Sequence, residues 1–198
     1  MEGVRHLVSR VAIEQLSAIH ALSDLGFELI DGIQTYSRPI EGNEPIAADT
    51  RLFDAGDLDS VLEIARSSFV HDRFHCDSSL SEQVADRVNE TWTRNCCLGR
   101  AADAVVIAEV ESRPASYVAC RVDPKNQLGT IILVATALWA RGQGAAARAT
   151  RGALHWFAAQ DIRLVEVGTQ LKNIPAARLY EGCGFRLSGV SLTFRKLI

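Results

Sequence analysis

The chain has 198 residues, of which 47% are hydrophobic, and its formal net charge is −3. These values fit one soluble globular domain with room for a small appendage, and they exclude fibrous, collagen-like and disordered chains. Because the arginines are scattered and offset by 24 acidic residues, we expect no nucleic-acid-binding surface.

The sequence also indicates where the chain resides. Its longest uncharged stretches, such as residues 128–140, are well below the roughly 18 apolar residues of a membrane span. Residues 1–10 carry charges and no apolar core of a signal peptide, so we expect a cytoplasmic protein without a membrane partner. The five cysteines form no regular framework and are expected to be reduced thiols. His71, His75 and Cys76 lack a second ligand pair, so no metal is expected.

The N-terminal segment predicts a strand, a helix and a second strand, and this order returns near the C-terminus. Residues 5–27 and 163–185 have equal length and both end in Gly-Phe, and Thr35-Tyr36 matches Thr193-Phe194 at the same offset. We infer an internal repeat of about 35 residues. Gln15 and Leu22 stand in the first copy where Asn173 and Tyr180 stand in the second.

The rest of the chain predicts alternating strands and helices. Residues 41–48 are the best linker, so we expect an N-terminal lobe at 1–45 and a main domain at 49–198. Apolar spacing predicts helices at 58–69, capped by Asp54, and at 81–94. Three strands at 104–110, 116–122 and 130–136 should form a meander. An Ala-rich helix ending near Gln160, a strand at 163–169, a helix at 174–182 and an extended segment from Phe185 complete an α/β chain.

A glycine-containing loop lies between the third strand and the Ala-rich helix. In Arg141-Gly142-Gln143-Gly144-Ala145-Ala146 the glycines allow a close turn, and the helix directs its positive dipole end to the same place. This pattern is typical of a pyrophosphate site, although a plain glycine turn remains the alternative. A third glycine of the dinucleotide motif and the Lys-Ser or Lys-Thr of a Walker loop are both missing, so NAD and ATP are poor candidates.

Two motifs in order carry a family resemblance. Arg141-x-x-Gly144-x-Ala146 is followed by Asn173-x-x-Ala176-x-x-Leu179-Tyr180-Glu181-x-x-Gly184-Phe185. Together they resemble the acetyl-CoA-binding motifs of the GCN5-related N-acetyltransferases (GNAT), over residues 49–198. The resemblance implies the GNAT acyl-CoA N-acyltransferase fold, whose mixed sheet is splayed between the strands predicted at 130–136 and 163–169. The pantetheine arm of acetyl-CoA would lie in that opening.

The resemblance also implies roles for single residues. Tyr180 would protonate the departing thiolate, with a core-packing tyrosine as the alternative. A backbone N–H near Val134 or Ala135 would stabilise the oxyanion. No general base is identified: His75, Asp77, Glu109 and Glu166 are candidates on position alone, and a water chain or deprotonation of the amine in bulk solvent would serve equally well. Arg148 and Arg151 are interpreted as solvated arginines, with contact to the outer phosphates of the cofactor as the alternative. The implied cofactor-binding residues are Val134, Ala135, Arg141, Gly142, Gln143, Gly144, Ala145, Ala146, Asn173 and Ala176.

A finer resemblance concerns the acceptor. Phe69-x-x-Asp72-Arg73-Phe74-His75-x-Asp77, Ala85-Asp86, Trp92, Asn95 and Val167-Gly168-Thr169-Gln170 are similar to the nucleotide-amino-sugar acetyltransferases of the dTDP-fucosamine type, which carry a partial N-terminal lobe of the same fold. The resemblance implies that Arg73, His75, Asp77 and Gln170 bind a sugar nucleotide, Arg73 through its pyrophosphate. Arg195 stands where such enzymes carry a histidine.

Other functions stay open on the sequence alone. The chain could bind CoA without turnover, as a sensor or scaffold, although the intact loop and Tyr180 disfavour that reading. It could also acetylate a protein N-terminus, a lysine, an antibiotic or another small amine. The expected partner is a small-molecule amine, and a homodimer stays open.

Overall fold

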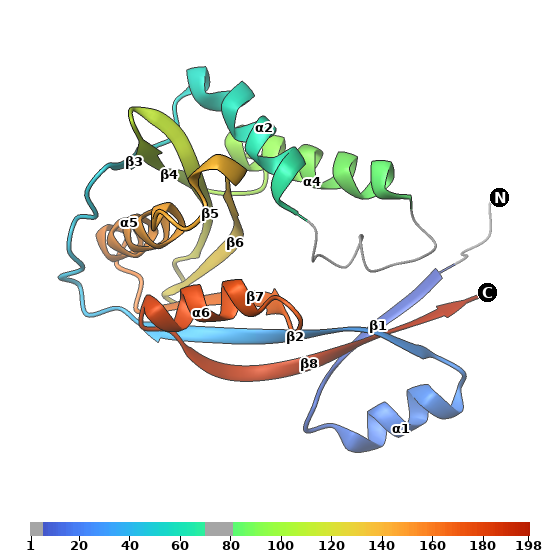
Figure 1. Ribbon diagram of the computed structural model, residues 1–198. Helices are drawn as coiled ribbons and strands as arrows, with labels where there is room; N and C mark the ends of the chain where they lie inside the picture. Colours follow the sequence, from blue (N-terminus) through green and yellow to red (C-terminus); the bar gives the residue numbers. More distant parts are fainter. Residues whose placement is uncertain (1–5, 70–80) are drawn as a thin grey trace.

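The computed structural model describes residues 6–69 and 81–198, whose strands form one eight-stranded mixed sheet (Figure 1). The strand order is β1-β8-β2-β7-β6-β5-β4-β3. The strands are β1 (His6–Ala12), β2 (Glu28–Pro39), β3 (Thr50–Leu52), β4 (Ala104–Val110), β5 (Arg113–Asp123), β6 (Leu128–Thr136), β7 (Leu164–Gln170) and β8 (Arg186–Leu197). The α-helices are α1 (Leu16–Asp24), α2 (Leu58–Ser68), α4 (Glu82–Cys97), α5 (Ala145–Ala159) and α6 (Ile174–Gly182).

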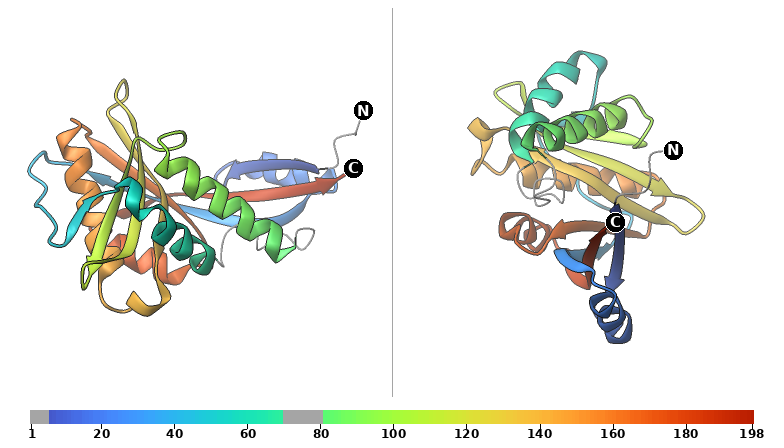
Figure 2. Two further views of the ribbon diagram at one scale, coloured as in Figure 1. Left: turned by 90° about the horizontal axis from the view of Figure 1, so that it is seen from above. Right: turned by 90° about the vertical axis from the view of Figure 1, so that its right-hand side faces the viewer.

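Helices cover both faces of the sheet around β4, β5 and β6 (Figures 1 and 2). On one face α2 packs through Val61 and Ile64 against a cluster that includes Tyr117 and Leu133. On the other face α5 and α6 cover a second cluster, which includes Phe157. The α/β fold with a mixed sheet is therefore confirmed. Within the described residues no helix is long and apolar enough to cross a membrane.

The expected meander of β4, β5 and β6 is confirmed, with one difference at its first turn. The sequence prediction left five residues, 111–115, between the first two strands, whereas β5 begins at Arg113. Glu111 and Ser112 both have positive φ, 52° and 59°, which is the backbone conformation of a two-residue type I′ hairpin. Because non-glycine residues rarely adopt positive φ, such a turn is usually recognised by a Gly or Asn. Here Glu and Ser occupy the two positions, so the sequence did not reveal the turn.

The internal repeat is matched by the positions of the elements. β1 begins at residue 6 and β7 at residue 164, an offset of 164 − 6 = 158 residues. The same offset relates α1 to α6 and β2 to β8, at both ends of each element. The strands of the two copies alternate, because β8 lies between β1 and β2, and β2 lies between β8 and β7. The division into 1–45 and 49–198 stays a prediction, and strands from both segments share one sheet.

The two copies differ in what surrounds them. In α6 the side chains of Ala177 and Tyr180 are buried, whereas α1 has no buried residue. The C-terminal copy adjoins β6 and α5, while α1 lies at the far end of the sheet beside β1 and β8 (Figure 1). Of the two equivalent helices, α6 is therefore the one packed into the core.

The predicted opening between two strands is present. β6 and β7 pair in parallel, but only at Leu128–Ile131 with Leu164–Val167, and both strands then continue without pairing to each other. Beyond Val167 the other edge of β7 stays paired with β2 as far as Gln170. The sheet thus separates into two halves at this point, as the family resemblance implied.

Candidate active site

The loop after β6 has the geometry of an anion-binding turn. Gly142 and Gly144 have φ of +75° and +74°, a left-handed conformation that favours glycine. A Cβ added at Gly142 would meet nothing within 4 Å, and one at Gly144 would meet only the Arg148 side chain at 3.8 Å. The space in front of this backbone is therefore open, which fits a diphosphate approaching the N-terminus of α5.

The four backbone N–H groups at residues 143–146 are not equally available to a diphosphate. The Gln143 N–H already donates to the Ala140 carbonyl at 3.4 Å. Gly144 is the N-cap of α5, so its N–H and those of Ala145 and Ala146 belong to the helix start, where backbone donors lack intrahelical acceptors. These three amides are the stronger candidates. Arg141 is exposed beside them.

Arg148 has a different environment from the solvated one we expected. Its Nη1 donates to the Gln143 carbonyl at 3.0 Å, and its Nη2 donates to the Glu109 carbonyl of β4 at 3.1 Å. One guanidinium thus ties the glycine loop to the sheet. Arg151, nearly one turn further along α5, is exposed, as expected. No motif identified this tether, because both acceptors are backbone atoms.

The direction of the β6 backbone separates the two oxyanion candidates. The Ala137 N–H donates to the Ala115 carbonyl of β5, Ala135 lies opposite Tyr117 of β5, and the Ala135 carbonyl also accepts from the Ser116 side-chain hydroxyl. In an antiparallel pair the N–H and C=O of one residue point to the same neighbour, and alternate residues point oppositely. The Val134 amide therefore points away from β5, toward the opening, and the Ala135 amide does not.

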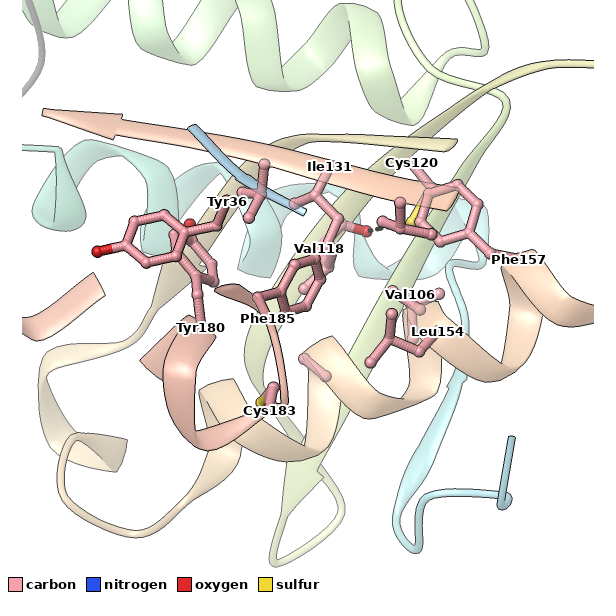
Figure 3. Close-up of a cluster of buried hydrophobic side chains, with 14 of the residues drawn as sticks. Tyr36, Val106, Val118, Cys120, Ile131, Leu154, Phe157, Tyr180, Cys183 and Phe185 are labelled. Carbon is pink, nitrogen blue, oxygen red and sulfur yellow. Dashed lines mark hydrogen bonds between the residues drawn. The ribbon is translucent and has the colours of Figure 1, made fainter. Parts of the chain in front are cut away.

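Tyr180 lies beside the narrow end of this opening. It is 4% exposed, and its ring lies between those of Tyr36 and Phe185, with centroid distances of 5.9 and 6.0 Å. Tyr36 pairs with Val167, the last residue of β7 that pairs with β6. Figure 3 shows Tyr36 and Tyr180 at one end of the buried cluster and Phe157 at the other.

Burial changes the acidity of this tyrosine. The pKa of the Tyr180 phenol is raised above its ordinary value, chiefly because desolvation disfavours the charged form and secondly because of Cys183. Tyr180 therefore stays protonated at neutral pH, but it is a weaker acid than the value of about 10 used for the sequence expectation. A thiolate leaving into the same desolvated environment also becomes more basic, which preserves the driving force for protonation.

The other predicted cofactor residues lie at the start of α6. Asn173 is its N-cap, and its Oδ1 accepts from the Ala176 N–H at 3.2 Å, which leaves the Asn173 Nδ2 for a ligand. Gln170 ends β7, is half-buried and pairs with Ile33 of β2. These residues therefore flank the wide side of the opening.

Several candidates lie elsewhere. Arg73, His75 and Asp77 fall outside the described residues. Glu109 forms an ion pair with Arg51 at 2.7 Å, and Glu166 lies opposite Thr130 in the closed part of the β6–β7 pair, so neither is well placed as a base. Among the described residues no group of His, Cys, Asp or Glu could hold a metal ion.

Comparison with known proteins agrees with this geometry. A family model for the "Acetyltransferase (GNAT) family" matches residues 58–185. The chain is 32% identical over 130 residues to the spore coat polysaccharide biosynthesis protein SpsD of Bacillus subtilis, covering 66% of this chain and 44% of that protein. It is 23% identical over 184 residues to the dTDP-fucosamine acetyltransferase of Escherichia coli O6:H1, covering 87% of this chain and 73% of that protein.

Solved structures show the same fold. A GCN5-related N-acetyltransferase from Sphaerobacter thermophilus superposes with a TM-score of 0.67 at 16% identity, over 97% of this chain and 59% of that one. A tandem GNAT protein from the clavulanic acid biosynthesis pathway superposes with a TM-score of 0.66 at 12% identity, over 98% of this chain and 64% of that one. The chain thus spans only part of these relatives. The family model, the relatives and the shared fold establish that this chain belongs to the GNAT family of acetyltransferases, whose co-substrate is acetyl-CoA.

Proposed function

We propose that the chain transfers the acetyl group of acetyl-CoA to the primary amine of a nucleotide-linked deoxy-amino sugar, of the dTDP-4-amino-4,6-dideoxyhexose type. The observation that carries the transfer is the opening between β6 and β7, with the glycine loop and Tyr180 beside it. The sugar acceptor is supported by the two relatives, one named as a dTDP-fucosamine acetyltransferase and the other as a spore coat polysaccharide biosynthesis protein.

Acetyl-CoA would bind across the opening. The N–H groups of Gly144, Ala145 and Ala146 would hold its diphosphate at the helix N-terminus, where the dipole favours negative charge. Asn173 would contact the pantetheine arm through its Nδ2. The Val134 amide, which points into the opening, would donate to the thioester oxygen.

The reaction needs positioning more than a strong catalyst, because a thioester already reacts with a free amine held at near-attack distance. The amine nitrogen forms a bond to the thioester carbon, and the carbonyl oxygen becomes an oxyanion near the Val134 amide. When the C–S bond breaks, the thiolate takes a proton from the Tyr180 hydroxyl. The nitrogen releases its proton to a base or to water. Tyr180 then regains a proton from solvent, so all atoms balance.

The acceptor would enter from the side where β7 ends. Gln170 lies at that end, and Arg73, His75 and Asp77 complete the proposed acceptor set through the sequence resemblance. A guanidinium suits a sugar-nucleotide diphosphate, which it can bind with two parallel hydrogen bonds.

A screen for CoA thiol release tests the proposal. Acetyl-CoA is offered with dTDP- and UDP-linked 4-amino sugars, polyamines, aminoglycosides and N-terminal peptides. We expect turnover with a nucleotide-linked amino sugar, and a KM for that acceptor that rises in Arg73→Gln while the KM for acetyl-CoA is unchanged. Turnover restricted to peptides or aminoglycosides would overturn the sugar acceptor. Binding of CoA without turnover on any amine would overturn the enzymatic proposal.

A further inference from the structure

Tyr36 of the N-terminal segment reaches the centre of the proposed active site. It lies on β2, is 2% exposed, and its ring packs on that of Tyr180 at 5.9 Å with an angle of 53° between the planes. Phe185 lies on the other side of Tyr180 at 6.0 Å. Tyr180 is therefore held between one aromatic ring from each copy of the repeat (Figure 3).

A hydrogen-bond chain fixes Tyr36 in turn. The Tyr36 hydroxyl donates to the Gln34 Oε1 at 2.6 Å, and the Gln34 Nε2 donates to the Leu171 carbonyl at 3.2 Å. Leu171 lies two residues before Asn173, the N-cap of α6. Gln34 thus contacts the chain just before α6, and Tyr36 contacts the ring of Tyr180 in the second half of α6. Together the two residues fix both the helix and Tyr180.

This arrangement cannot be supplied by the C-terminal copy itself. After α6 the chain continues into β8, which pairs with β2 and β1 and not with β7. The place beside β7 is taken by β2, and the residue opposite Val167 at the end of the closed β6–β7 pair is Tyr36. Any group that orients Tyr180 from this side must come from the N-terminal segment.

We propose that Tyr36 and Gln34 are positioning residues that hold the Tyr180 hydroxyl toward the opening between β6 and β7. The N-terminal segment, which lacks its own tyrosine at Leu22, thereby completes the catalytic centre of the other copy. This inference rests on the proposed role of Tyr180 as the proton donor. It does not depend on which amine is the acceptor.

The kinetic test removes the ring and the hydroxyl of Tyr36 separately. Tyr36→Leu opens space beside Tyr180, and we expect kcat to fall about 10²-fold, close to the loss in Tyr180→Phe, with the KM for acetyl-CoA within about 3-fold. Tyr36→Phe keeps the ring and loses one hydrogen bond, so it should restore kcat to within about 5-fold of the parent. The double variant Tyr36→Leu/Tyr180→Phe should be no slower than Tyr180→Phe alone, because both changes disable the same proton transfer.

The repeat provides a matched control. Phe194 occupies in β8 the place that Tyr36 occupies in β2, and it is 3% exposed. Phe194→Leu removes a similar buried ring from the other copy and should lower thermal stability about as much as Tyr36→Leu, with kcat unchanged. If Phe194→Leu lowers kcat as Tyr36→Leu does, or if Tyr36→Leu keeps full kcat while Tyr180→Phe loses it, the inference is wrong.

A spectroscopic test is independent of turnover. The chain has three tyrosines, so 3-fluorotyrosine labelling gives three ¹⁹F resonances that single Tyr→Phe variants assign. With CoA as the probe, the Tyr180 resonance should shift in the parent and in Phe194→Leu, and this shift should be lost or broadened in Tyr36→Leu. An unchanged CoA-dependent shift in Tyr36→Leu would overturn the positioning role. Turnover on a different amine, with none on the nucleotide-linked sugars and with an intact ¹⁹F response, would reject only the proposed acceptor.

Discussion

Ile33 of β2 and Ser191 of β8 pair with each other at the middle of the four strands β1-β8-β2-β7, and they hold the same place in the two copies of the repeat. The remaining register follows the same symmetry. His6 pairs with Leu197 and Leu164 pairs with Pro39, and replacing each residue by its equivalent in the other copy converts one pair into the other. The two register shifts of the β2–β8 pair lie symmetrically about Ile33 and Ser191.

This symmetry explains how one active site arises from two related halves. Each copy contributes two strands to the four-stranded part β1-β8-β2-β7 at one end of the sheet, but only the C-terminal copy adjoins β6. The glycine loop and the opening therefore exist on one side only. The N-terminal copy remains in contact with that side through β2, which borders β7.

Replacing Tyr180 by Phe should lower kcat roughly 10²-fold, because it removes the proton donor and leaves the aromatic packing in place. The Kd for CoA should change little. Since burial raises the pKa of Tyr180, its titration should not lower kcat as pH rises from 7 to 9.5. Steady-state kinetics and calorimetry with CoA measure both quantities.

Tyr117→Phe is the matched control for Tyr180→Phe. Tyr117 is also buried, and its hydroxyl bonds to that of Thr93 at 2.9 Å in the other hydrophobic cluster. Its loss should cost about 1 kcal/mol of stability and leave kcat intact. Equal kcat in Tyr180→Phe and the parent would remove Tyr180 from the mechanism.

Gly144→Ala should weaken acetyl-CoA binding about 10-fold while lowering stability by only about 1 kcal/mol. The added Cβ fits without a backbone clash, but it disfavours the left-handed conformation and projects where the diphosphate would approach. Calorimetry with CoA measures the affinity. Gly99→Ala, at φ +69° with nothing within 4 Å, carries the same backbone cost away from the loop and should bind CoA normally. Similar affinities in the two variants would contradict the loop's role.

Arg148→Met should raise the KM for acetyl-CoA about 5-fold with kcat retained, because the loop loses its tie to the Glu109 carbonyl. Arg148→Lys should not restore the KM, since an ammonium cannot bridge the two carbonyls as the planar guanidinium does. Arg151→Met, at an exposed arginine of the same helix, should behave as the parent. A KM in Arg148→Met equal to that in Arg151→Met would show that the tether has no effect on binding.

Stability should fall at alkaline pH because of buried thiols. Burial raises the pKa of Cys96 to about 11 and that of Cys97 to about 12, from 9.0 in an exposed cysteine. A folded-state pKa above the unfolded value means that the stabilising contribution is present below pH 9 and is lost as pH rises toward 11. The urea midpoint should therefore drop between pH 8 and 10.5. Cys96→Ala should show a smaller drop, and an equal drop would refute this assignment.

Most elements and the glycine loop could be predicted from residue patterns alone. Apolar spacing located α2 and α4, and the loop motif located Gly142 and Gly144, because helix periodicity and positive φ depend on residues close together in the chain. The repeat was also readable, since it needs only a constant offset. The type I′ turn at Glu111 and Ser112 was missed because neither residue favours that conformation.

The identity of neighbouring strands, by contrast, emerged only from the assembled sheet. An apolar strand pattern indicates that one face of a strand is buried, but it does not identify the neighbouring strand. The place of β2 between β8 and β7 depends on pairing between segments far apart in the chain. That placement brings Tyr36 and Gln34 to Tyr180. Long-range pairing also directs the Val134 amide toward the opening and places the Glu109 carbonyl within reach of Arg148. Backbone carbonyls and strand partners leave no residue-type signal, so these contacts become visible only when distant strands have paired.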